Sequence, residues 1–211
     1  KSLGTLSTEL VLQKMTSMDA KNTAILLPFA FFCLAAFTKS AQVPFESWLC
    51  GAMVAPTPVS ALLHSATMVK AGTYLLLRMA PAFAGTTMST IVALFGAFTF
   101  VATCILAVSQ SNAKKVLAYS TIANLGLIIA CVGINTAASM MAATTIIIYH
   151  SVSKGLLFMC VGAIEQRIGS RDIVATRENV LPVERRADLG LQNGADFGRP
   201  HGAVINDVDV E

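Results

Sequence analysis

Long apolar stretches separated by short polar breaks make up most of the chain between Thr23 and Gln166. A stretch of about 20 apolar residues is long enough to cross a bilayer as a helix. We predict five such spans, the first continuing irregularly beyond its apolar run, at about 23–53, 58–79, 89–109, 116–134 and 136–166. Proline, glycine and asparagine fall at the breaks, where they favour turns over helix. The pattern therefore predicts an all-α polytopic membrane protein whose transmembrane domain covers residues 23–173.

The two ends of the chain differ from this apolar block. We predict that residues 1–22 form an N-terminal loop and that residues 174–211 form a polar tail that is disordered or aberrant. The sequence begins with Lys1 and not with Met, so we interpret the chain as a fragment. A truncated product or a shifted reading frame explains the tail best, and a genuine soluble tail is the alternative.

Composition supports the membrane assignment. Hydrophobic residues make up 55% of the 211 residues and charged residues 13%, against about 25% charged in an ordinary soluble domain. A soluble surface needs more charge than this block carries, so we exclude a soluble globular protein. Basic residues are scattered and form no run with aromatic residues, so no nucleic-acid partner is expected. The five cysteines lie far apart without a CxxC motif, so we predict no disulfide framework, metal site or cofactor bound by this chain.

The charges in the loops predict the orientation of the spans. Lys114 and Lys115 lie in the loop after the third span, and Arg167 and Arg171 lie at the end of the fifth, on the same side. The opposite side carries Arg78 and two lysines before the first span. Because basic residues in short loops favour the cytoplasm, we place the Lys114/Lys115 loop and Arg167/Arg171 there, with the protein in a prokaryotic inner (plasma) membrane.

Lysines and histidines occupy positions inside the apolar spans, where charge is costly. Lys70 is about eleven residues from Pro81, or about 16 Å of helix, and Lys154 is about as deep, so snorkelling covers only part of the distance. His150 precedes Lys154 by one helical turn and shares its face. A central lysine costs about 2.5–3.5 kcal/mol on insertion scales and usually faces a bundle interior or a hydrated path.

The residue types favour a proton relay across the middle of the membrane. Arginine stays protonated and is found here at the span ends, whereas a desolvated lysine and a histidine can bind and release a proton. The predicted relay consists of Lys39, His64, Lys70, His150 and Lys154. The structural alternatives are that Lys39 snorkels from a helix end, that His64 is a hydrogen-bonded core residue, and that Lys70 and Lys154 cap unwound backbone or form fixed ion pairs.

A second group of residues is expected to support this relay by breaking helices or by adding polar groups. Its candidate members are Pro44, Glu46, Pro56, Pro58, Ser65, Thr67 and Ser153. Non-helical backbone at membrane depth is tolerated only where it is buried in protein or lines a watery cavity. Discontinuous helices at ion sites are a recurring device of transporters.

Four segments resemble the antiporter-like subunits of respiratory complex I, multisubunit sodium/proton antiporters and membrane-bound [NiFe] hydrogenases. They are residues 38–49 (TKSAQVPFESWL), 51–72 (GAMVAPTPVSALLHSATMVKAG), 109–126 (SQSNAKKVLAYSTIANLG) and 149–158 (YHSVSKGLLF). The resemblance covers about residues 25–173. Residues 165–173 are most similar to the energy-converting hydrogenase branch, and the chain as a whole to the hydrogenase or NADH-quinone oxidoreductase subunit L type.

The resemblance implies a fold of two inverted five-helix repeats, of which this chain holds the last two helices of the first and the first three of the second. It implies that Lys39 is the lysine at the broken helix of one half-channel, that His64 and Lys70 connect onward, and that His150 and Lys154 lead into the other half-channel. A glutamate paired with the Lys39-type residue is expected upstream, and an exit lysine or glutamate downstream.

We therefore expect a proton-translocating membrane subunit of a redox-driven complex, of the NADH-quinone oxidoreductase or membrane-bound hydrogenase type. Its partners would be the lipid bilayer and other membrane and hydrophilic subunits, which would carry the flavin/FeS or NiFe/FeS centres. Nothing in the chain resembles a catalytic redox site of its own. The alternatives are a subunit of a multisubunit Na+/H+ antiporter with no redox partner, and a truncated fragment that does not transport.

Overall fold

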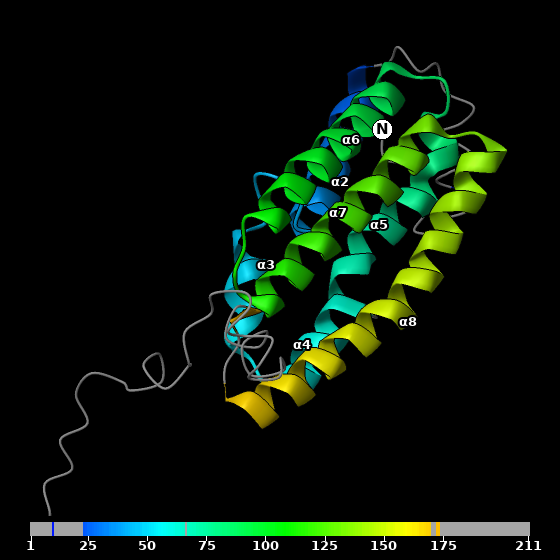
Figure 1. Ribbon diagram of the computed structural model, residues 1–211. Coiled ribbons are helices and arrows are strands. Elements are labelled where there is room, and N and C mark those ends of the chain that lie inside the picture. The colour runs from blue at the N-terminus through cyan, green and yellow to red at the C-terminus, as the bar shows by residue number, and fades with distance from the viewer. Residues whose placement is uncertain (1–9, 11–22, 66, 170–171, 174–211) are drawn as a thin grey trace, which may run out of the picture.

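The computed structural model describes Leu10 and residues 23–65, 67–169 and 172–173, all of them helical or in short connections (Figure 1). The expected N-terminal loop over 1–22, the tail over 174–211, and Arg171 lie outside the described residues, except for Leu10. The named helices are α2 (Thr23–Lys39), α3 (Ser47–Gly51), η1 (Ala52–Val54), α4 (Thr57–Ser65), α5 (Met68–Met79), η2 (Ala80–Phe83), α6 (Thr87–Val108), α7 (Ala113–Ile134) and α8 (Ala137–Ile168). The all-helical prediction is confirmed for this part of the chain.

The three longest helices begin and end at residues suited to those positions. The Asn112 side chain accepts hydrogen bonds from the first backbone amides of α7, and Asn135 ends the same helix in the left-handed conformation. Thr136 and Ser139 form a reciprocal capping box at the start of α8. Gly169 ends α8 with a φ of 74°, which glycine adopts without strain.

Helices α6, α7 and α8 are long and apolar enough to cross a membrane, and the 17-residue α2 is a shorter apolar helix. The segment expected as one span over 58–79 is instead two helices, α4 and α5, separated between Ser65 and Met68. In Figure 1, α4 and α5 follow one another beside α8, which runs the length of the bundle. One side of α6 carries exposed apolar side chains, including Leu94, Phe98 and Ile105.

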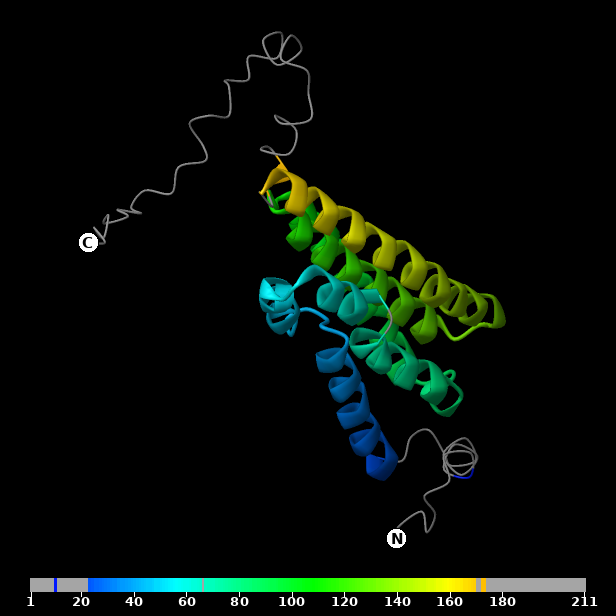
Figure 2. The ribbon, with the colours of Figure 1, turned by 90° about the horizontal axis from the view of Figure 1, so that it is seen from below.

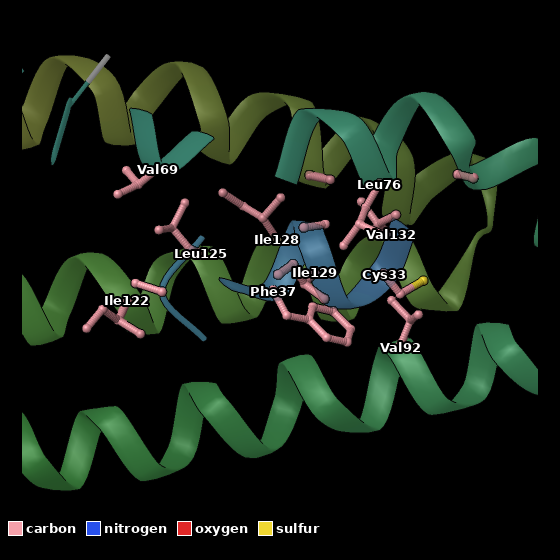
Figure 3. Close-up of a cluster of buried hydrophobic side chains, with 14 of the residues drawn as sticks. Cys33, Phe37, Val69, Leu76, Val92, Ile122, Leu125, Ile128, Ile129 and Val132 are labelled. Atoms are coloured by element: carbon pink, nitrogen blue, oxygen red, sulfur yellow. The ribbon is translucent and has the colours of Figure 1, made fainter. Parts of the chain in front are cut away.

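The core lies where α7 packs against α5 and α6, with α2 packed against α5. Figure 3 shows Val69 and Leu76 of α5 facing Leu125 and Val132 of α7, and all four side chains are at most 1% exposed. Gly126 of α7 lets α6 approach closely, because a Cβ there would lie 2.8 Å from the carbonyl oxygen of residue 96 in α6. Close approach through small residues is typical of helix pairs in membranes.

The chain is irregular from the end of α2 to the start of α4. Ala41 has a φ of 51°, and the Val43–Pro44 peptide bond is cis. The Trp48 indole Nε1 donates a hydrogen bond of 3.1 Å to the Thr38 carbonyl, one of the acceptors left open where α2 ends. In Figure 2 this connection carries the chain from α2 to α3 and then back toward α4, which packs against α8.

Candidate functional site

Lys70 lies in the first turn of α5, just after the interruption that follows α4. Its side chain is buried, and its Nζ atom reaches α8. There Nζ donates a 3.0 Å hydrogen bond to the Ile147 carbonyl and a second hydrogen bond to the Ser151 hydroxyl. Because the ammonium bonds to another helix instead of to water outside the bundle, Lys70 joins α5 to α8 through a charged group inside the apolar block.

Lys154 makes a comparable connection from α8 to α7. It is buried, and its Nζ donates a 2.7 Å hydrogen bond to the Ser120 hydroxyl. A weaker contact of 3.5 Å joins the same Nζ to the Leu117 carbonyl. The two buried lysines therefore link three helices, α5 to α8 and α8 to α7, and Ser151, which binds Lys70, lies about one turn of α8 before Lys154. Neither lysine has a carboxylate partner among the described residues.

His64 and His150 are buried in the same region of the bundle as these lysines. His64 is fully buried and His150 is 2% exposed, and no ring nitrogen of either has a protein hydrogen-bond partner in the described part of the chain. The charges of Lys70 and Lys154 are close enough to act on His150, and that of Lys154 also acts on His64. Buried polar atoms are normally paired with protein or ordered water. Four unpaired ring nitrogens near two buried lysines therefore form a polar cluster suited to hydration.

The phenyl ring of Phe158 packs on one side of this cluster. Its centroid lies 4.8 Å from that of the His64 ring, and Phe158 itself is fully buried. Ser65, the last residue of α4, faces Gly155 of α8, where an added Cβ would lie 3.7 Å from its hydroxyl. The end of α4 thus rests against α8 at the residue that directly follows Lys154. The helix interruption positions His64 and Lys70 on the two sides of this contact.

The structure does not bring Lys39 to this cluster. Lys39 is the last residue of α2 and is exposed, and its Nζ makes no hydrogen bond or ion pair within residues 23–65, 67–169 and 172–173. It lines a cavity of about 600 Å³ together with Gly72 and Arg78. The described site therefore contains four of the five predicted relay residues.

None of the predicted supporting residues forms a described hydrogen bond with Lys70 or Lys154. Pro44 and Glu46 lie in the irregular connection after α2, and Pro56 and Pro58 are exposed at the start of α4. Two others bond to nearby backbone: the Thr67 hydroxyl donates to the Leu62 carbonyl at 3.3 Å, and the Ser153 hydroxyl to the Tyr149 carbonyl at 2.7 Å. Only Ser65 lies beside the cluster.

Sequence reasoning missed four residues with polar roles. Ser120 and Ser151 bind the two central lysines, and no local pattern distinguishes them from other serines in apolar helices. Lys114, expected in a loop, lies in the first turn of α7, where its buried Nζ is 2.6 Å from Glu165 Oε2. The scarcity of acids is the signal that could have found this pair, because Glu165 is one of only two in the apolar block. Among the described residues, no group of three or more His, Cys, Asp or Glu side chains converges as metal ligands would.

Comparisons with known proteins place these features in a family. The family model described as "NADH:quinone oxidoreductase/Mrp antiporter, TM" matches residues 2–182. An Na(+)/H(+) antiporter subunit of Bacillus subtilis is 49% identical over 152 residues, covering 66% of this chain and 19% of that protein. The "Putative antiporter subunit mnhA2" of Staphylococcus aureus is 46% identical over 169 residues, covering 72% and 21%. The chain spans about a fifth of the length of these relatives.

Two solved structures share the fold. The Mrp complex from Dietzia sp. DQ12-45-1b matches with a TM-score of 0.65 and 45% identity, over 67% of this chain and 16% of that one. The membrane-bound sulfane sulfur reductase, an archaeal respiratory membrane complex, matches with a TM-score of 0.61 over 80% and 46%. At 19% identity the second match shows the fold alone. These relatives support the antiporter alternative better than the redox-driven expectation.

Proposed function

The chain belongs to the NADH:quinone oxidoreductase/Mrp antiporter family of membrane proteins, and from that premise we propose that it forms part of the ion-translocating subunit of a multisubunit Na+/H+ antiporter. Its protons would cross the middle of the membrane through Lys70, His64, His150 and Lys154. The observation that carries the proposal is the buried cluster in which Lys70 reaches α8, Lys154 reaches α7, and two nearby histidines have no protein hydrogen-bond partner in the described residues.

The chemistry of the cluster suits proton transfer. Each lysine can alternate between an ammonium, held by a serine hydroxyl and a backbone carbonyl, and a neutral amine that accepts a proton. Each imidazole has one nitrogen that accepts and one that donates, so it can pass a proton between water molecules on its two sides. Charge held in low-dielectric surroundings is costly, and a proton arriving at one lysine therefore favours departure of the proton on the other.

The choice of an antiporter over a redox-driven complex rests on the relatives. Those reported above at 45–49% identity are named as antiporter subunits or belong to an Mrp complex. An antiporter exchanges Na+ for protons directly and is driven by the gradient of one of these ions. This chain then needs no electron-transfer partner. In the redox-driven alternative, hydrophilic partner subunits carry flavin/FeS or NiFe/FeS centres. In both cases the partners include other membrane subunits.

We further propose a role for Lys39 and an orientation of the bundle in the membrane. The exposed Lys39 side chain lines a cavity beside Gly72 and Arg78. A further helix could pack in this cavity and continue the proton path from the central cluster to the half-channel that the family resemblance assigns to Lys39. We place the ends of α7 and α8 that carry Lys114, Lys115 and Arg167 in the cytoplasm of a prokaryotic cell. Cysteine substitution of the exposed Lys115, followed by labelling from each side of the membrane, tests this orientation.

An ion-exchange assay tests the proposed function. The complete subunit that carries this segment is expressed with its partners in bacteria that lack their own Na+/H+ antiporters, and inside-out vesicles are energised to an acidic interior. Addition of Na+ is expected to dissipate the pH gradient when no hydrogen, NADH or other reductant of the complex is supplied. If Na+ has no effect and protons move only during oxidation of such a reductant, the redox-driven alternative is correct.

A further inference from the structure

A buried ion pair lies at the end of the bundle where α7 begins and α8 ends. Lys114 is in the first turn of α7, and its side chain is 2% exposed. Its Nζ lies 2.6 Å from Oε2 of Glu165, whose side chain is 20% exposed. Glu165 follows Lys154 by about three turns of α8, so the two side chains share one face of that helix. The path described above does not use this pair.

Apolar side chains separate the ion pair from the central lysine. On α7, Leu117 and Ala118 lie between Lys114 and Ser120, which binds Lys154. On α8, Phe158 lies between Lys154 and Glu165. These belong to a small apolar cluster, which we call the Phe158 layer, formed by Met53, Ala61, Ala118 and Phe158 with Leu117 against them. A dry layer of this kind keeps the ion pair and Lys154 apart until water enters.

The other side of the ion pair is accessible from the end of the bundle. Glu165 is partly exposed there. The pair therefore has access to solution through the Glu165 carboxylate, and the Phe158 layer lies along α7 and α8 between the pair and Lys154.

We infer that Lys114 and Glu165 form the site where the buried path exchanges protons with the solution at this end, an inference that rests on the proposed function. When the Glu165 carboxylate takes up a proton from solution, the ion pair is lost. The Lys114 ammonium then passes its proton through water in the Phe158 layer to a neutral Lys154. The proton on Glu165 moves to Lys114 and restores the pair. One proton has moved from solution to Lys154, and the reverse sequence releases one.

Paired substitutions separate this role from a structural one. In the complete antiporter, Lys114→Met with Glu165→Met replaces the ion pair by apolar side chains of similar length, which buried sites often tolerate. The exchange Lys114→Glu with Glu165→Lys keeps an ion pair but moves the carboxylate to the less exposed position. The control is Lys115→Met, at an exposed neighbour. Membrane levels, melting temperature and the Na+-dependent rate of proton movement are measured for each.

We expect both paired variants to accumulate and melt like the control, while the exchange rate falls by about 100-fold, the low end of what a positioned proton-transfer group contributes. If either paired variant moves protons in response to Na+ at the rate of the control while Lys154→Ala is inactive, the inference is wrong and the proposed function stands. Normal rates in Lys154→Ala would instead overturn the proposed function. If neither paired variant accumulates while Lys115→Met does, the pair only holds the helices together and the inference is wrong.

Discussion

Replacement of Ser151 by alanine removes one contact of the central cluster and little else. The Ser151 hydroxyl accepts a hydrogen bond from Lys70 Nζ, whose other acceptor is the Ile147 carbonyl at 3.0 Å. The hydroxyl also donates to that same carbonyl at 2.8 Å. Alanine keeps the helix and loses only the hydroxyl. Any change in ion movement therefore reports on how the Lys70 ammonium is held.

The size of the effect follows from the type of bond. A hydrogen bond to a charged group contributes about 1.5–3 kcal/mol, and each 1.36 kcal/mol corresponds to about tenfold in rate. Because the Ile147 carbonyl remains as an acceptor, we expect the lower end, about a tenfold slower exchange of Na+ for protons in vesicles. Ser153→Ala is the matched control, since the Ser153 hydroxyl on the same helix bonds only to the Tyr149 carbonyl in the described contacts. If Ser151→Ala exchanges ions at the rate of this control while assembling normally, Lys70 is not held on the path as described.

Three further predictions concern neighbouring features. Ser120→Ala removes the 2.7 Å partner of Lys154 and should slow exchange by about tenfold, measured in the same vesicles; a wild-type rate would contradict the role of that contact. Gly126→Leu forces a side chain into the backbone of α6 and should destabilise the bundle by about 1–3 kcal/mol, seen as a lower melting temperature. Gly51→Ala is the control, because an added Cβ there meets open space, and it should melt like wild type. Trp48→Phe loses one backbone hydrogen bond and should lower stability by about 1 kcal/mol without changing ion exchange; slower exchange in a stable variant would place this connection on the path.

Much of the architecture could be predicted because it depends on local chemistry. Apolar runs of sufficient length indicate α6, α7 and α8, and capping residues such as Asn112 and Thr136 mark their starts. The depth of Lys70 and Lys154 in apolar sequence also indicates their burial, because no nearby surface is within reach of the side chain. Both lysines are buried in the structure.

The interruption after Ser65 and the partners of the lysines could not be read from the sequence. Helices buried on all sides have no clear polar face, so periodicity does not show where one helix becomes two. The sequence pattern predicts a loop position for Lys114 because this residue precedes an apolar run. Its burial depends on Glu165, 51 residues away, which meets it only when α8 packs against α7. Contacts of this kind are set by tertiary packing and not by local sequence.

The central claim is that protons cross the bundle through the buried lysines and histidines, and Lys154→Ala tests it most directly. The complete antiporter with this substitution is compared with Lys115→Ala, which changes an exposed lysine on the helix that binds Lys154. Proton movement is measured with a pH-sensitive dye in vesicles, alongside the amount of assembled complex. The account predicts that Lys154→Ala assembles but moves no protons in response to Na+, while Lys115→Ala is active. Proton movement at the control rate in an assembled Lys154→Ala variant would contradict it.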